Sequence, residues 1–255
     1  MDLIKTHTFE LALNIKGDED SQKLALVLPG RLDTKDYACF NSHLEYLANR
    51  GFLAVSFDSP GTWESPGGIG LFTTTNYIKA VNELIEYFGN KPTLLIGHSR
   101  GGAVANIVGT NNPVVVALIT VNASFGTPSP PSPEEMKLKM YVDYRDLPPG
   151  DKKTSIKKRF EVPLTYFEDG EQYDDAEILK ICRKPKLIFY STNDEFHPPG
   201  EVKAIFDSLP EPKVLHELKC SHDYRYYPEI VNEVNKEIEL FLDKYFFLIR
   251  LKTNH

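Results

Sequence analysis

The chain has 255 residues, of which 41% are hydrophobic and 25% are charged, as in ordinary globular proteins. Its formal net charge of −7 argues against nucleic-acid binding as the main role, because affinity for phosphate backbones is carried by Lys and Arg. The densest basic run, at residues 152–159, is followed by an acidic stretch, so we interpret it as a solvated face.

The three cysteines, Cys39, Cys182 and Cys220, are too widely spaced for a disulfide framework or a zinc site. We therefore expect free thiols, no metal and no cofactor. The N-terminus lacks the charged-then-apolar pattern of a signal peptide, and no apolar run is long enough to span a bilayer. The sequence predicts a cytoplasmic protein without stable membrane insertion.

Apolar runs alternate with helical periodicities in the first part of the chain. Alternation over residues 9–15 predicts a half-buried strand, and the apolar run 24–28 predicts a buried one. Helical spacing at 37–47 precedes an apolar run at 53–57, and helical spacing at 78–88 precedes a run at 93–96. A glycine, Gly51 or Gly89, ends each of these helices.

The second half of the chain continues this pattern. We predict buried strands at 114–121, 186–190 and 214–218, a helix at 202–209 and a long amphipathic helix from Ile230 to Tyr245. Such alternation predicts an α/β fold with a mostly parallel sheet covered by helices on both faces. Because both halves share it, we expect residues 1–255 to form a single domain.

Residues 127–184 break the rhythm, because they separate two predicted strands by far more chain than a crossover needs. The stretch opens with four prolines in six residues and is predicted to hold a helix near 134–144. We expect an inserted cap or lid over a pocket. Its apolar underside would consist of Met136, Met140, Tyr141, Tyr144 and Leu147. The alternative is an excursion that packs on one edge and never meets a substrate.

The segment Gly97-His98-Ser99-Arg100-Gly101 matches the pattern G-x-S-x-G. Alone the pattern is weak, since roughly one chain in ten of this length contains it by chance. Here it directly follows the predicted strand 93–96 and precedes a helix that opens with small residues. A sharp strand-to-helix turn holds a serine at the sheet edge beside a helix N-terminus, which favours negative charge. We predict that Ser99 is a nucleophile; the alternative is a glycine-rich turn with an incidental serine.

With these features the chain resembles the α/β-hydrolase superfamily, and it is most similar to the serine esterase, serine aminopeptidase and monoacylglycerol-lipase-like branches. The resemblance spans about residues 7–246 and includes Asp58-Ser59-Pro60-Gly61, which is similar to a D-x-P-G turn of many members. The family order of nucleophile, acid and histidine implies that Asp194 and His222 are the partners of Ser99.

In this arrangement His222 takes the serine proton and Asp194 orients the imidazole. Asp194 follows the strand 186–190, and His222 follows the last strand. The neighbouring Glu195 is the alternative acid, and His197 is the rival base.

An oxyanion hole needs two backbone N–H groups aimed at the developing negative charge. We expect one from Arg100, directly after the nucleophile. The other should come from the loop after the strand 24–28, with Arg31 as first choice and Leu32 as the alternative. Many relatives have His-Gly where this chain has Pro29-Gly30, a departure that leaves the hole intact.

The main hypothesis is a serine esterase, a carboxylic ester hydrolase that cleaves a small-molecule ester, thioester or amide through an acyl-enzyme on Ser99. One alternative is a non-catalytic ligand-binding or receptor protein on the same fold. Another is an acyltransferase or C–C hydrolase that uses the same triad. The sequence lacks H-E-x-x-H, P-loop and G-x-G-x-x-G motifs. The acyl chain length and the oligomeric state are left open.

Overall fold

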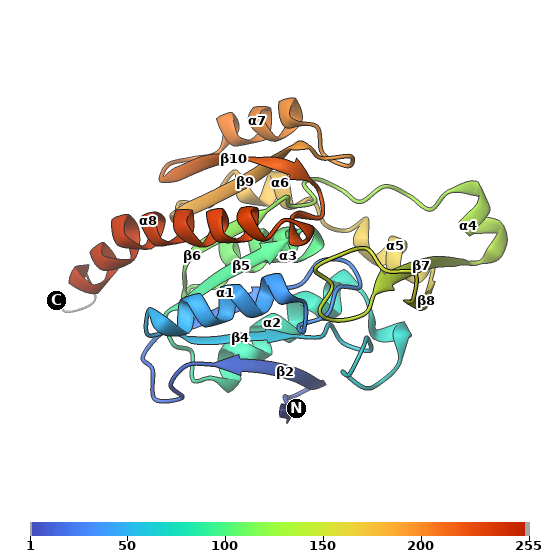
Figure 1. The fold of residues 1–255 in the computed structure, drawn as a ribbon, viewed down its shortest axis with the longest axis horizontal. Helices are drawn as coiled ribbons and strands as arrows, with labels where there is room; N and C mark the ends of the chain where they lie inside the picture. Colours follow the sequence, from blue (N-terminus) through green and yellow to red (C-terminus); the bar gives the residue numbers. More distant parts are fainter. Residues whose placement is uncertain (1, 253–255) are drawn as a thin grey trace.

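A computed structural model describes residues 2–252, and its centre is an eight-stranded sheet (Figure 1). The strand order is β1-β2-β4-β3-β5-β6-β9-β10. The bounds are β1 (Asp2–Lys5), β2 (Glu10–Lys16), β3 (Leu24–Leu28), β4 (Leu53–Phe57), β5 (Thr93–His98), β6 (Val115–Val121), β9 (Lys186–Asn193) and β10 (Lys213–Ser221). β1 and β2 are antiparallel additions to an otherwise parallel sheet, which confirms the predicted fold class.

Helices cover both faces of this sheet (Figure 1). α1 (Ala38–Asn49) and α8 (Pro228–Lys252) pack on one face; α2 (Thr74–Tyr87) and α3 (Arg100–Asn111) pack on the other. α6 (Asp175–Leu179) and α7 (Pro199–Ser208) extend the second layer towards β9. The helical spacing in the sequence explains this packing, because Phe40, Leu44 and Leu47 all face the sheet and are fully buried.

Within residues 127–184, the predicted helix near 134–144 is only partly present, and the second part of that range is a strand. α4 (Pro133–Leu138) ends after six residues, because Lys139 adopts a left-handed conformation with φ 55°. The chain then forms β7 (Met140–Asp146), which pairs antiparallel with β8 (Lys157–Pro163) in a separate two-stranded sheet. α5 (Thr165–Gly170) and α6 lead back to β9. The mixed aromatic and charged alternation of residues 141–146 concealed this hairpin.

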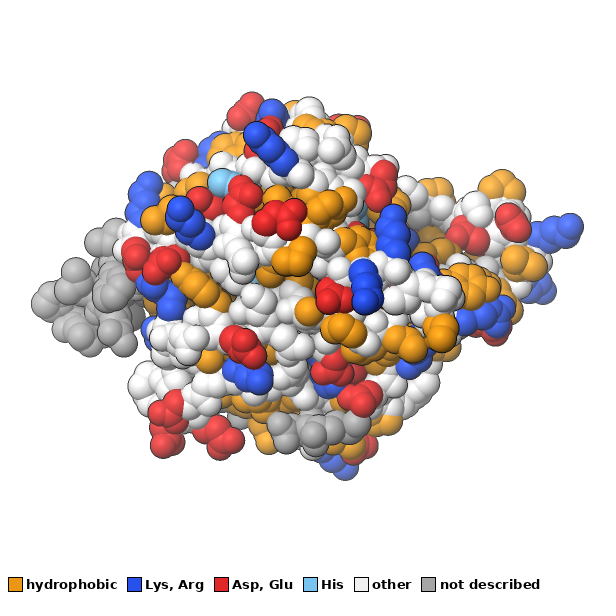
Figure 2. Space-filling model, viewed as in Figure 1, with side chains coloured by type: hydrophobic (Ala, Val, Ile, Leu, Met, Phe, Trp, Pro, Cys, Tyr) orange, Lys and Arg blue, Asp and Glu red, His pale blue; other side chains and the backbone are white. Residues whose placement is uncertain are grey.

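Charged side chains of both signs are mixed on the surface shown in Figure 2, whereas the three cysteines are buried. Figure 2 shows acidic and basic side chains interspersed over one face, with the projection formed by α4 at one side. Cys39, Cys182 and Cys220 are free and buried. Among residues 2–252, no helix combines the length and apolarity needed to cross a membrane.

Candidate active site

Ser99 stands on the sharp turn between β5 and α3, with φ 50° and ψ −121°. Its two flanking glycines are required by close backbone contacts. A Cβ atom on Gly97 would lie 2.2 Å from the carbonyl oxygen of Gly101, and one on Gly101 would lie 2.1 Å from that of Leu28. The strained backbone therefore fixes the serine at the carboxyl edge of the parallel strands.

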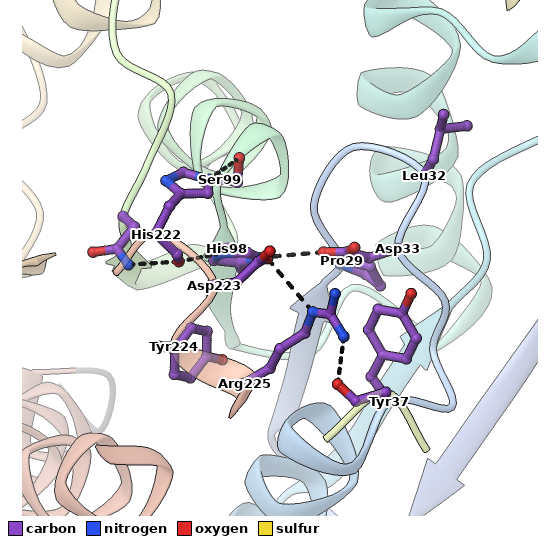
Figure 3. A network of polar contacts seen from close by, with 12 residues as sticks. Pro29, Leu32, Asp33, Tyr37, His98, Ser99, His222, Asp223, Tyr224 and Arg225 are labelled. Carbon is purple, nitrogen blue, oxygen red and sulfur yellow. Dashed lines mark hydrogen bonds and ion pairs between the residues drawn. The ribbon is translucent and has the colours of Figure 1, made fainter. Parts of the chain in front are cut away.

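The side chains of Ser99, His222 and Asp194 form a continuous chain of hydrogen bonds. His222 Nε2 lies 2.9 Å from Ser99 Oγ, and His222 Nδ1 lies 2.9 Å from Asp194 Oδ2. Figure 3 shows His222 beside Ser99. Burial acts to raise the pKa of Asp194, but the hydrogen bond and charge of His222 outweigh it and lower that pKa. An ionised Asp194 accepts from Nδ1–H, so Nε2 is left to accept the serine proton.

The two alternatives considered from the sequence occupy other positions. Glu195 Oε2 accepts a hydrogen bond of 3.1 Å from the backbone N–H of His222 and does not contact its ring. The His197 ring lies 6.5 Å from the His222 ring, centre to centre, while its backbone N–H donates to Asp194. Asp194 and His222 thus form the hydrogen bonds that lead to Ser99. Glu195 and His197 contact this series through the backbone N–H groups of His222 and His197.

The Ser99 hydroxyl has a second neighbour that sequence reasoning missed. Ser124 Oγ lies 3.2 Å from Ser99 Oγ, and the Ser124 backbone N–H donates to the Ser99 carbonyl at 3.1 Å. Ser124 follows β6, the strand beside β5. Polar residues just past the carboxyl ends of adjacent parallel strands gather at one edge of the sheet, and this signal was available in the sequence.

The loop after β3 approaches Ser99 at Gly30, where an added Cβ atom would lie 3.3 Å from Ser99 Cβ, and continues into Arg31 and Leu32. Within the described chain, the backbone N–H groups of Arg31, Leu32 and Arg100 donate no hydrogen bond, so both candidates from this loop keep a free donor. Leu32 is left-handed, with φ 57°, and its carbonyl accepts a hydrogen bond of 2.8 Å from the Trp63 indole. Burial of the Leu32 side chain and this indole contact hold a backbone conformation that a leucine otherwise avoids.

The buried pair of His98 and Asp33 contacts the backbone of His222. His98 Nδ1 lies 3.3 Å from Asp33 Oδ2, and His98 Nε2 lies 3.2 Å from the carbonyl oxygen of His222 (Figure 3). Asn122 donates to the same carbonyl at 2.9 Å. Burial acts to raise the pKa of Asp33, but the His98 hydrogen bond and the charge of Arg145 lower it to about 2. These contacts fix the backbone on which the His222 ring turns.

An ion pair connects the same histidine loop to the β7–β8 hairpin. Arg225 Nη2 lies 2.9 Å from Asp146 Oδ2, and both side chains are almost fully buried. The Arg225 guanidinium also contacts Asp223 (Figure 3) and donates to the carbonyl oxygen of Gly150. Arg225 lies three residues after His222, so the end of β7 and the histidine loop are held together.

Ser99 and His222 line a cavity of about 630 Å³. One wall comes from α3, and much of the opposite wall comes from residues 127–184. The side chains of Tyr141, Asp143 and Arg145 alternate along β7 and line it, followed by Tyr166 and Phe167 of α5. No cluster of three or more metal-ligating side chains occurs in the part of the chain that the structure describes.

The apolar underside predicted for this segment needs correction. Of its five side chains, Tyr141 lines the cavity, whereas Met136, Tyr144 and Leu147 are 60%, 53% and 41% exposed and Met140 is absent from the lining. The reason is the strand: successive side chains point to opposite faces, so Tyr141 and Tyr144 cannot share one. Aromatic and charged side chains therefore form this wall.

Comparison with known proteins agrees with this architecture. Residues 26–145 match the family model described as the alpha/beta hydrolase fold. The matched stretch contains the β3 loop, the D-x-P-G turn and the Ser99 elbow. The chain adopts the α/β-hydrolase fold.

Solved structures with this α/β-hydrolase fold cover nearly the whole chain at low identity. Est1E from Butyrivibrio proteoclasticus, solved with ferulic acid, is 17% identical, with a TM-score of 0.73, over 94% of this chain and 98% of its own. Monoacylglycerol lipase of Paleococcus ferrophilus is 19% identical, with a TM-score of 0.70, over 92% and 99%. Alpha/beta hydrolase domain-containing protein 10 from mouse is 19% identical, with a TM-score of 0.74, over 95% and 98%. Among curated proteins, no sequence matches significantly.

Asp175 is an unusual carboxyl in the cavity of this α/β-hydrolase-fold protein. It is 1% exposed and accepts hydrogen bonds from Asn106 Nδ2 at 2.7 Å and from the Gly126 N–H at 2.8 Å. Burial raises the pKa of Asp175 from 3.8 to about 7, and these two hydrogen bonds only partly oppose it. Asn106 Oδ1 has no hydrogen-bond partner in the described structure. An amide turned over at Asn106 would accept from the protonated carboxyl.

The raised pKa of Asp175 makes the stability of the folded protein depend on pH. Since the folded-state pKa of Asp175 lies above its ordinary value, the folded protein binds the extra proton. The stabilisation is fully present below about pH 4 and is lost as pH rises towards 7. We expect Asp175→Asn to remove this pH dependence. The unfolding free energy of wild type minus that of the variant should fall by up to about 4 kcal/mol between pH 4 and pH 7.

Urea unfolding at several pH values between 4 and 7.5 measures this difference, and the contributions of other groups cancel. Asp151→Asn is the matched control, because Asp151 is exposed. Parallel stability curves for wild type and Asp175→Asn would contradict the prediction.

Proposed function

We propose that this protein is a serine hydrolase, a carboxylic ester hydrolase whose nucleophile is Ser99. The observation that carries the proposal is the hydrogen-bonded series from Ser99 Oγ to His222 and Asp194, with 2.9 Å at each step, at the wall of a cavity large enough for a small acyl substrate. The esterase and lipase among the structures of similar fold support the same class of reaction.

The reaction follows from this geometry. Ser99 Oγ attacks the substrate carbonyl while its proton passes to His222 Nε2, and the charged imidazole is stabilised by Asp194. The carbonyl oxygen becomes negative and accepts hydrogen bonds from the backbone N–H groups of Arg31 and Arg100. His222 then returns its proton to the leaving group. Water, activated by the same nitrogen, attacks the acyl-enzyme and releases the acid.

Labelling by a fluorophosphonate probe, followed by peptide mass spectrometry, tests this proposal. An activated serine reacts, so the label should be found on the peptide that carries Ser99. A parallel screen of 4-nitrophenyl esters of graded chain length, thioesters and aminoacyl amides identifies the substrate class. Absence of both labelling and turnover in the folded protein would favour a non-catalytic ligand-binding protein. Transfer of the acyl group to an added acceptor would indicate an acyltransferase.

We also propose that residues 127–184 act as a cap that shapes the acyl pocket. Phe167 lines the cavity, whereas Phe160 belongs to the same aromatic cluster but not to the lining. The two side chains are 7% and 6% exposed, so they make a matched pair. Removing the whole segment would expose this cluster, which makes substitution the better test.

Phe167→Leu should enlarge the pocket and shift the preference towards longer acyl chains, with relative kcat/KM changed roughly tenfold. Phe160→Leu should lower stability about as much as Phe167→Leu does, but it should leave the preference for acyl chain length unchanged. The chain-length profile with 4-nitrophenyl esters is the measurement, and thermal unfolding checks the match. An unchanged profile in folded Phe167→Leu would place specificity in the core loops.

A further inference from the structure

Arg100 carries a buried positive charge that forms no ion pair within the described residues. The side chain is 6% exposed and lines the cavity beside Ser99. Its guanidinium donates one hydrogen bond, of 3.2 Å, to Thr74 Oγ1, and Nη1 has no partner among the described residues. A guanidinium has five N–H donors and stays charged in proteins. Such a group is normally buried only with a carboxylate or phosphate partner.

Aromatic rings account for part of the stabilisation of this cation. The Arg100 guanidinium lies 4.3 Å from the ring centre of Phe72 and 4.4 Å from that of Tyr166. These two rings are nearly parallel, with their centres 5.3 Å apart, and both lie within cation–π distance of the guanidinium. Ring faces attract a cation by about 0.5–2 kcal/mol each, which is far less than the cost of burying a lone charge. The Phe72 and Tyr166 rings therefore position the guanidinium but do not neutralise it.

The carboxylates that line the cavity are already engaged. Asp143 pairs with Arg145 at 2.9 Å, Asp33 with His98 at 3.3 Å and Asp223 with Arg225 at 3.5 Å. Asp175, Glu195 and Glu135 accept hydrogen bonds from other groups. No ion pair to Arg100 is formed within residues 2–252. Asp169 acts on Arg100 through its charge but forms no ion pair with it and does not line the cavity. A ligand in the cavity could therefore supply the missing ion-pair partner.

A second arginine strengthens the positive character of this wall. Arg31 lies 4.9 Å from the ring centre of Tyr141 and 3.8 Å from Asp143, an acid that Arg145 approaches more closely. Burial lowers the pKa of Arg100 and the charge of Arg31 adds to this effect, while Tyr166, Tyr77 and Asp169 oppose it only in part. Both arginines line the cavity that contains Ser99.

We propose that the Arg100 guanidinium is an anion subsite of this cavity and that the preferred substrates carry a free carboxylate in addition to the bond that is cleaved. Half-esters of dicarboxylic acids have this chemistry: the ester carbonyl meets Ser99, and the distant carboxylate pairs with Arg100. A carboxylate matches the fork of a guanidinium, and the methylene chain between the two groups packs on the Tyr166 and Phe167 rings. This inference deepens the proposed hydrolase function and rests on it for the reaction, but not for the binding of the anion.

The test compares ethyl half-esters of succinic, glutaric and adipic acid with ethyl esters of monocarboxylic acids of the same chain length. Wild type should favour at least one half-ester by about tenfold or more in kcat/KM, as expected for a charge-assisted hydrogen bond. Arg100→Met, which keeps the backbone N–H, should abolish that ratio. Arg100→Lys should restore part of it, because it keeps the charge but loses the fork.

Arg50→Met is the control for net charge, because Arg50 binds Glu239 and Asp243 at the other edge of the sheet. It should leave the ratio unchanged. Equal kcat/KM for half-esters and neutral esters in wild type, or a ratio unaffected by Arg100→Met, would overturn the anion subsite.

Calorimetric titration separates this inference from the proposed function, since it needs no turnover. Adipate should bind wild type more tightly than hexanoate, and Arg100→Met should lose the difference. If no ester is cleaved while adipate binds in an Arg100-dependent manner, the hydrolase proposal fails and the subsite stands. If esters are cleaved but adipate shows no advantage over hexanoate, the subsite fails and the hydrolase proposal stands.

Discussion

Ser99→Ala should lower kcat by at least about 10⁴-fold while the protein stays folded, because the proposed nucleophilic oxygen is removed. Binding and the oxyanion donors are retained, so a small residual rate over water is expected. Steady-state hydrolysis of a 4-nitrophenyl ester, with circular dichroism as the check on folding, measures the effect. The fluorophosphonate label should disappear at the same time.

Ser124→Ala is the matched control for this loss. It removes a hydroxyl 3.2 Å from Ser99 Oγ but leaves the bonds of Ser99 to His222 and of His222 to Asp194 in place. We expect a much smaller decrease in kcat. A folded Ser99→Ala protein with more than about a tenth of wild-type kcat would refute the nucleophile assignment.

Asp194→Asn should lower kcat by about 10⁴-fold with little change in KM. An amide at this position presents an N–H to His222 Nδ1, so the ring adopts the tautomer with its proton on Nε2. That nitrogen then cannot accept the proton of Ser99. The substitution is nearly isosteric, and substrate contacts in the cavity are retained, which is why the effect falls on kcat.

Glu195→Gln serves as the comparison for Asp194→Asn. The Glu195 side chain accepts from the backbone N–H of His222, and an amide oxygen can do the same. We expect a decrease of less than about tenfold, which steady-state kinetics on the same ester would resolve. A large loss in Glu195→Gln together with near-normal Asp194→Asn would transfer the role of the acid by one residue.

Most of the sheet and its helices could be predicted, because their periodicities are simple. Parallel strands buried on both faces appear as continuous apolar runs, such as Leu24–Leu28, and helix faces appear as repeats, such as Phe40, Leu44 and Leu47. Ser99 was predicted from its strand–turn–helix context, and Asp194 and His222 from the family order. Their side chains meet because all three follow the carboxyl ends of neighbouring or nearby strands.

Strand β7 and the polar surroundings of the site could not be predicted. On β7 the residues that face the cavity are Tyr141, Asp143 and Arg145. They recur every second position, but two of them are charged, so the strand shows no alternation of apolar and polar residues. Pairs such as Asp146 with Arg225 join residues 79 apart, and charge alone does not reveal which acid meets which base. β8 did carry a signal, since Phe160 and Val162 are buried between exposed Arg159 and Glu161.

The Asp146–Arg225 pair restricts how a substrate enters. If the hairpin swung outward as a hinged flap, Asp146 would separate from Arg225, and a charge that stays buried without its partner costs several kcal/mol. The same swing would pull on the loop that carries His222 and misalign the ring during each opening. This ion pair favours a hairpin that stays in place, with substrates entering through the existing opening of the cavity. Turnover of bulky substrates should accordingly be limited by the width of that opening and not by the rate of a gate.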